Sequence, residues 1–127
     1  MIYLAIDPGL SKIGVAISRE GKIAEPLADF EAHNLLDQIT RLITEHKPDK
    51  IVIGEPDSGP IKDLALVLKD EIKSVFKGEV VLHSEDLSSQ MARKKMIEAG
   101  MPKQKRQKGD HSLAATIVLQ DYLDLLQ

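Results

Sequence analysis

The chain has 127 residues, of which 43% are hydrophobic and 3% aromatic, with no cysteine or tryptophan and a formal net charge of -3. This length fits one domain over residues 1–127 with an aliphatic core, and the absence of cysteine excludes disulfides and thiolate metal sites. Scarce aromatic residues argue against base-stacking platforms, and no segment is long and apolar enough to span a membrane, so we expect a soluble, cytoplasmic protein.

The first half of the chain predicts three closely spaced strands, a helix and a fourth strand. The first three expected strands are residues 2–7, 13–18 and 22–30. Their short connections favour an antiparallel meander. Apolar residues then recur at helical spacing from Leu35 until Pro48 stops the helix, and a short β-branched strand follows at residues 50–54.

The second half alternates helices with one more strand. The expected elements are a helix at 61–76, a strand at 79–83, a helix from Ser88 or Ser89 to Ala99, and a helix from Asp110 to about Leu125. The last helix is apolar around much of its girth, so it should pack against the sheet. Later strands need crossover connections and are therefore parallel to a neighbour. This order predicts an α/β fold with a mixed five-stranded sheet, three antiparallel strands and then two parallel ones, flanked by helices.

Four acidic residues occupy the ends of these elements. Asp7 ends a predicted strand, Glu55 and Glu85 follow predicted strands within two residues, and Asp110 begins the last helix. In open sheets the functional crevice lies at the carboxyl ends of the parallel strands, so neighbouring strands of the same direction would bring the first three acids to one rim. Phosphodiester hydrolysis needs an activated water and a neutralised leaving oxygen, and two magnesium ions supply both. The four carboxylates are therefore candidate catalytic residues and ligands of Mg²⁺, with Mn²⁺ compatible with the same ligand types.

Each of these residues also has a structural explanation. Asp7 before Pro8-Gly9 could be only a turn residue, and Glu55 could be a solvent-facing loop acid. Glu85 could favour the dipole of the following helix, and Asp110 could be an ordinary N-cap. His111 could serve as a general acid or a phosphate ligand, although a histidine at a helix start is usually incidental.

Basic residues concentrate between positions 93 and 108, where seven lysines and arginines accompany a single acid, Glu98. Such a stretch beside clustered carboxylates offers phosphate contacts next to a cation site. The candidate nucleic-acid-binding residues are Lys12, Lys103, Lys105, Arg106 and Lys108. They would bind backbone phosphates without reading bases, and a solvated helix face and loop is the structural alternative.

Segments along the whole chain together resemble a known family. They are Ile6-Asp7-Pro8-Gly9, Lys12-Ile13-Gly14-Val15-Ala16, Ile51-Val52-Ile53-Gly54-Glu55-Pro56, Ser84-Glu85-Asp86-Leu87-Ser88-Ser89, Glu98-Ala99-Gly100, Asp110 with Leu113-Ala114-Ala115, and Leu119-Gln120-Asp121-Tyr122-Leu123-Asp124. Their order resembles that of the YqgF-type pre-16S ribosomal RNA nucleases, which are related to the RuvC Holliday junction resolvases. The resemblance implies a ribonuclease H-like fold and a metal-dependent nuclease that processes the 5′ end of the 16S ribosomal RNA precursor, with that precursor as partner.

The chain also departs from the pattern of that family. Glu55 occupies the middle of a Gly-x-Pro motif that usually holds a small or aliphatic residue, an arrangement more like that of the resolvases. The Asp-Glu-Arg-Leu-Thr-Thr motif keeps only Glu85 and Leu87, and the chain lacks the arginine as a candidate phosphate contact. A Holliday junction resolvase, a nucleic-acid-binding domain without turnover and a phosphate-loop ATPase relative therefore remain as alternatives. No apolar stripe marks a dimer face, so the sequence leaves the oligomeric state open.

Overall fold

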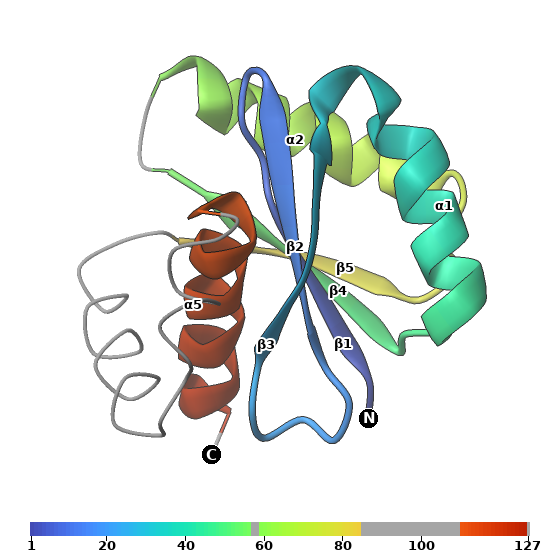
Figure 1. Ribbon diagram of the computed structural model, residues 1–127, viewed down its shortest axis with the longest axis vertical. Helices are drawn as coiled ribbons and strands as arrows, with labels where there is room; N and C mark the ends of the chain where they lie inside the picture. The colour runs from blue at the N-terminus through green and yellow to red at the C-terminus, as the bar shows by residue number, and fades with distance from the viewer. Residues whose placement is uncertain (57–58, 85–109, 127) are drawn as a thin grey trace.

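A computed structural model of the chain describes residues 1–56, 59–84 and 110–126. Five strands form one sheet in the order β3-β2-β1-β4-β5 (Figure 1). They are β1 (Tyr3–Asp7), β2 (Lys12–Ser18), β3 (Glu25–Glu31), β4 (Lys50–Glu55) and β5 (Glu79–Ser84). The first three are antiparallel, β4 is parallel to β1 and β5 is parallel to β4. The expected mixed sheet is confirmed.

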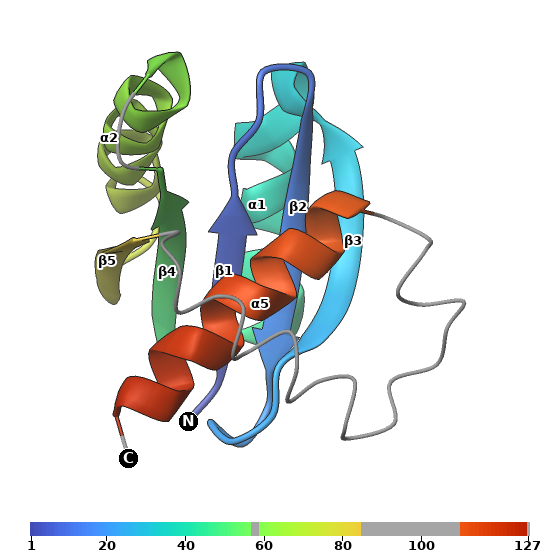
Figure 2. The same cartoon turned by 90° about the vertical axis from the view of Figure 1, so that its left-hand side faces the viewer.

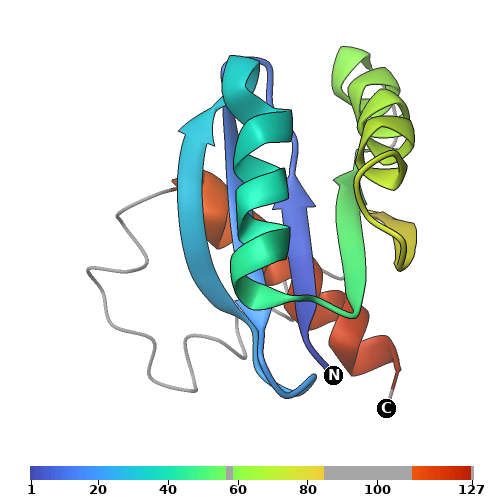
Figure 3. The same cartoon turned by 90° about the vertical axis from the view of Figure 1, so that its right-hand side faces the viewer.

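Helices cover both faces of the sheet. They are the short 3-10 turn η1 (Ala32–Asn34), α1 (Leu35–His46), α2 (Pro60–Lys73) and α5 (Asp110–Leu125). The turned views show α5 crossing one face diagonally, with α1 and α2 on the other (Figures 2 and 3). No helix among the described residues is long and apolar enough to cross a membrane.

The alternation of side chains along the strands builds a different core on each face. Leu4 and Ile6 of β1 point into a cluster of large aliphatic side chains under α1 and α2, whereas Tyr3 and Ala5 point toward α5. The α5 face of the sheet is rich in alanine, and small side chains allow a helix to approach the strands closely. Buried residues Ala115, Val118, Leu119 and Leu123 of α5 complete that layer.

Polar side chains of α5 tie this helix to the sheet and its loops. Gln120 accepts a hydrogen bond from the backbone N–H of Ala24 (2.9 Å) and donates one to the carbonyl of Lys22 (3.0 Å). Asp121 Oδ2 lies 2.6 Å from His83 Nε2 of β5. These contacts fix both the loop before β3 and the β5 edge to one helix.

Lys50, at the start of β4, forms a third tie. Its Nζ donates to the Tyr122 hydroxyl at 2.9 Å and pairs with Glu79 Oε1 at 2.9 Å. The Tyr122 hydroxyl and the Glu79 carboxylate together hold the pKa of Lys50 well above its ordinary value. This network lies at the end of β4 opposite Glu55. Because Tyr122 belongs to α5, the network holds α5 to the start of β4.

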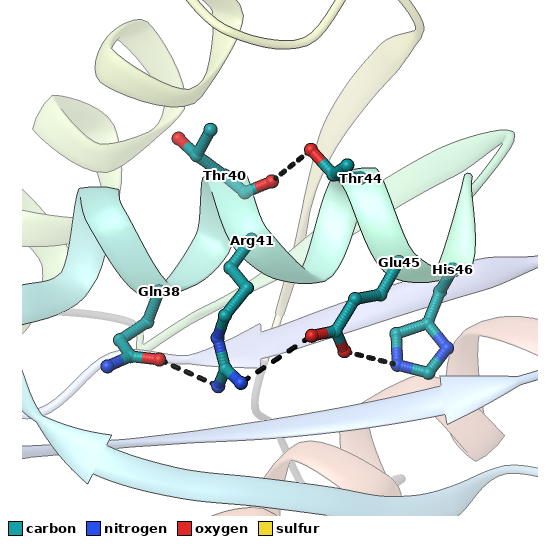
Figure 4. Close-up of polar contacts among 6 residues, drawn as sticks. All are labelled: Gln38, Thr40, Arg41, Thr44, Glu45 and His46. Atoms are coloured by element: carbon teal, nitrogen blue, oxygen red, sulfur yellow. Dashed lines mark hydrogen bonds and ion pairs between the residues drawn. The ribbon is translucent and has the colours of Figure 1, made fainter.

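The outer face of α1 is an ordinary polar surface (Figure 4). Arg41 donates to Gln38 at 2.8 Å and pairs with Glu45 at 3.6 Å, and Thr44 bonds the carbonyl of Thr40. These local contacts between exposed groups stabilise the helix modestly.

Some boundaries differ from those expected. Strand β3 begins at Glu25 and not at residue 22, because Gln120 holds the Lys22–Ala24 backbone outside the ladder. Helix α2 ends at Lys73, before the expected residue 76, and the amides of Val75 and Phe76 still bond the carbonyl of Ile72 in a closing turn. The helix expected from Ser88 or Ser89 to Ala99 lies outside the described residues.

Candidate active site

Asp7 is half-buried and ends β1 at the carboxyl edge of the parallel pair formed by β1 and β4. It pairs with Gly14 of β2, and Gly14 pairs in turn with Asp29 of β3. Residues paired directly across antiparallel strands point to the same face. Because Asp7 alternates with Tyr3 and Ala5, these three positions share the face that α5 covers.

The first turn of α5 rests directly on Gly14. A β-carbon added to Gly14 would lie 1.9 Å from both the carbonyl carbon and the carbonyl oxygen of His111. Glycine inside a strand commonly marks such a close backbone approach. The contact places the start of α5 immediately beside Asp7, although the two segments are far apart in the sequence.

Asp29 secures the same turn from the other side of Gly14. Its Oδ1 accepts a hydrogen bond from the backbone N–H of Ser112 at 2.9 Å. Ser112 is buried, with 4% of its surface exposed, whereas Asp29 is exposed. A carboxylate near the first turn of a helix also interacts favourably with the helix dipole.

His111 lies at the hairpin that follows Asp7. It is half-buried, and its Cε1 is 3.9 Å from the position that a β-carbon would take at Gly9. Its imidazole is thus directed toward the Asp7-Pro8-Gly9 turn. His111 therefore lies at the rim beside this turn.

Glu55 reaches the same rim from β4. It is the last residue of the strand, is half-buried and pairs with Ser84 of β5. It alternates with Ile51 and Ile53, which pack in the core under α1 and α2. The alternation therefore assigns Glu55 to the opposite face from Asp7, so the two acids share an edge of the sheet and not a face.

The remaining candidates are described in part or not at all. Asp110 is the first residue of α5, and its side chain lies outside the description. Lys12 is exposed at the start of β2, opposite Glu31. Glu85, Lys103, Lys105, Arg106 and Lys108 lie outside the described residues.

The donor chemistry at the rim suits a hard divalent cation. Asp7 and Glu55 supply carboxylate oxygens, which magnesium prefers to nitrogen or sulfur. Within residues 1–56, 59–84 and 111–126, no three His, Cys, Asp or Glu side chains gather into a metal-binding group. The described side chains would thus need a further acid, and the α5 contact with Gly14 brings the backbone of the Asp110-His111 start beside Asp7.

Gly14 and Asp29 were not among the candidate site residues predicted from the sequence. Both carry a signal nonetheless, because glycine and aspartate are unfavourable inside strands. Two such residues in consecutive predicted strands indicate a point at which another part of the chain approaches the sheet.

A separate pocket of about 330 Å³ lies on the other face, between the β1–β2 hairpin, α1 and α2. Its lining is mainly aliphatic and includes Leu10, Ile13, Leu35, Leu36, Leu64 and Leu68. Without clustered acids, it lacks the chemistry of the rim around Asp7.

Comparison with known proteins gives a consistent result. Residues 1–125 match the family model described as "RuvX: Holliday junction resolvase". A Chloroflexus aurantiacus protein named "Putative pre-16S rRNA nuclease" is 34% identical, with 97% of this chain and 86% of that protein covered. A Bacillus pumilus protein of the same name is 33% identical, with 99% of each covered.

Solved structures with the same fold include two resolvases. RuvC from T. thermophilus, in complex with a Holliday junction substrate, superimposes with a TM-score of 0.66 at 14% identity, covering 99% of this chain and 95% of that one. The fowlpox virus Holliday junction resolvase gives 0.61 at 15% identity, with full coverage of both chains. These likenesses confirm the expected ribonuclease H-like fold.

Proposed function

Because the chain belongs to the RuvX family, described as Holliday junction resolvases, we propose that it is a metal-dependent nuclease that hydrolyses phosphodiester bonds in structured nucleic acid. The 16S ribosomal RNA precursor is the proposed substrate, since relatives at 33–34% identity carry that substrate in their names. Work on a ribosome precursor places the protein in the cytoplasm under this proposal.

One observation carries the proposal: the first turn of α5 sits on Gly14 beside Asp7. An acid at the end of β1 and an acid at the start of α5 thus belong to adjoining backbone segments. Under this proposal, a cation held between the two carboxylates would offset their mutual repulsion.

Asp7 and Asp110 would hold magnesium, with manganese as a second suitable ion. Glu85 would complete the ligands, or Glu55 would do so by reaching around the edge of the sheet from the opposite face. A cation held by these carboxylates would supply an activated water and charge neutralisation at the leaving oxygen. His111, directed at the hairpin after Asp7, would donate a proton to the leaving oxygen. Lys12, Lys103, Lys105, Arg106 and Lys108 would hold backbone phosphates, which fixes the substrate without reading its sequence.

The test uses the Asp7→Asn variant on a labelled 16S precursor RNA and on a four-way DNA junction, each in magnesium, manganese or EDTA. We expect metal-dependent cleavage of the RNA and a loss of about 10³-fold or more in the variant, since the variant lacks a ligand carboxylate. Asp70→Asn, on the exposed surface of α2, is the matched control and should cleave normally. Cleavage that survives EDTA, or equal rates in the Asp7 variant, would overturn the proposal.

A resolvase that cuts branched DNA is the second candidate. It is favoured by Glu55 at the end of β4, where a resolvase-like motif was recognised, and by the RuvC-like fold. Metal-dependent cleavage of the junction and not of the RNA would select this candidate. Binding to either polymer without cleavage in any metal would instead indicate a nucleic-acid-binding relative without turnover.

A further inference from the structure

The backbone N–H of Ser112, in the first turn of α5, finds a hydrogen-bond acceptor on another element. The first N–H groups of a helix have no partner within the helix, and a polar side chain just before it usually supplies one. The residue before α5 is Gly109, which has no side chain that could accept. Asp29 of β3, 83 positions away from Ser112, supplies an acceptor to the Ser112 N–H at 2.9 Å.

The position of Asp29 in the sheet links this acceptor to the active site. Asp29 is paired with Gly14, and Gly14 is paired with Asp7. The backbone of His111 occupies the space above Gly14. The first turn of α5 is therefore held between two acids of one cross-strand row, with Asp29 bonding it on one side and Asp7 next to it on the other.

We propose that Asp29 is a positioning residue, which fixes the first turn of α5 so that Asp110 and His111 stay beside Asp7. The inference rests on the proposed nuclease function. Residues that orient metal ligands or reacting groups without touching the substrate typically change metal affinity or rate by about 10- to 100-fold. Displacement of a ligand by about 1 Å is sufficient for such an effect.

Asp29 could instead be a metal ligand itself, and asparagine separates the two roles. The asparagine carbonyl oxygen still accepts a hydrogen bond from Ser112, but it carries no negative charge for a cation. Alanine removes both properties. A positioning role thus predicts that Asp29→Asn rescues what Asp29→Ala loses, whereas a ligand role predicts that both variants fail.

The experiment compares wild type, Asp29→Asn, Asp29→Ala and the exposed control Asp70→Ala by three measurements. Hydrogen exchange at the Ser112 amide reports the bond itself. Calorimetric titration with manganese, without nucleic acid, reports the metal site, and kcat and KM on the 16S precursor RNA report turnover. If Asp29→Ala does not fold, Asp29→Val replaces it, since valine suits a strand and also lacks an acceptor.

For Asp29→Ala we expect at least tenfold faster exchange at Ser112, manganese affinity about tenfold weaker, and kcat about 10- to 100-fold lower with KM within about twofold. Asp29→Asn and Asp70→Ala should stay within about threefold of wild type in all three measurements. An Asp29→Ala variant with wild-type metal affinity overturns the inference, as does an Asp29→Asn variant that loses that affinity. If wild type binds the metal but cleaves nothing, the proposed function fails, and the affinities still decide whether Asp29 positions the site.

Discussion

At Gly14, the absence of a side chain decides whether α5 can reach the sheet. A methyl group there would lie 1.9 Å from the His111 carbonyl, which is far inside contact distance. We expect Gly14→Ala to displace the first turn of α5 and to reduce the free energy of unfolding by about 1–3 kcal/mol, the usual effect of overpacking. Cleavage should fall by about 10²-fold, because the residues of that turn move away from Asp7. Urea unfolding and initial rates measure both, and an unchanged midpoint would contradict the contact.

Lys47 shows the opposite case, a side chain where glycine would fit better. It ends α1 in the left-handed conformation, with φ 50° and ψ 58°. Lys47→Gly should raise the free energy of unfolding by about 1 kcal/mol, because glycine adopts this conformation without steric cost. Lys47→Ala removes the same charge but keeps a β-carbon, so it should give no stabilisation. Equal thermal midpoints for both variants would refute the conformational explanation.

Among the elements, α5 depends most on buried polar contacts. Gln120 is 5% exposed and satisfies the backbone of the loop before β3. Gln120→Ala leaves the Ala24 N–H without its acceptor, so we expect a loss of about 1–3 kcal/mol in chemical unfolding. Gln38→Ala, which breaks an exposed contact on α1, should cost less than about 0.5 kcal/mol. Similar losses of unfolding free energy in the two variants would show that burial of the Gln120 amide contributes little to stability.

Local sequence patterns predicted most of the elements. The β1 and β2 strands and the α1 and α5 helices have clear apolar periods, and their bounds agree with expectation within a residue or two. The start of β3 could not be predicted, because the Ala24 N–H just before it donates to Gln120, almost a hundred residues later in the chain. The 3-10 turn η1 before α1 also has no distinct signal in the pattern.

In the candidate site too, local sequence features could be predicted, whereas contacts between distant segments could not. Asp7 was recognised because a strand exit followed by Pro8-Gly9 is a local feature. Asp29 and the close contact at Gly14 could not be recognised in this way, since both acquire their roles only when α5 docks. The sequence thus indicated the acid on β1, while tertiary packing revealed what holds α5 against it.

Over the whole molecule, charge is distributed very unevenly. The net charge is -3, yet residues 93–108 hold seven basic side chains and one acid. Nucleic acid binding should therefore depend on this stretch and weaken with salt, because each neutralised phosphate releases counterions.

The salt dependence of binding tests this expectation. Glutamine in place of Lys103, Lys105, Arg106 and Lys108 should reduce the slope of log K against log salt by about 3, at roughly 0.7–0.9 for each lost phosphate contact. Glutamine at the exposed Lys73 and Lys77, near the end of α2, is the control and should leave the slope unchanged. Fluorescence anisotropy with the Asp7→Asn variant measures binding without cleavage. An unaltered slope in the variant with all four substitutions would show that phosphates are bound elsewhere.

The diagonal path of α5 across β1, β2 and β3 has a consequence for biosynthesis. Residues leave the ribosome in chain order, and α5 follows every strand of the sheet in the sequence. Until α5 emerges, no helix covers the alanine-rich face of the sheet beside Asp7. The packing partner of this face of β1 is the last helix of the chain. Contacts of such long sequence separation form late and slowly. A nascent chain would thus carry its β1 acid without the helix that completes the site, and nuclease activity would arise only after α5 has been translated.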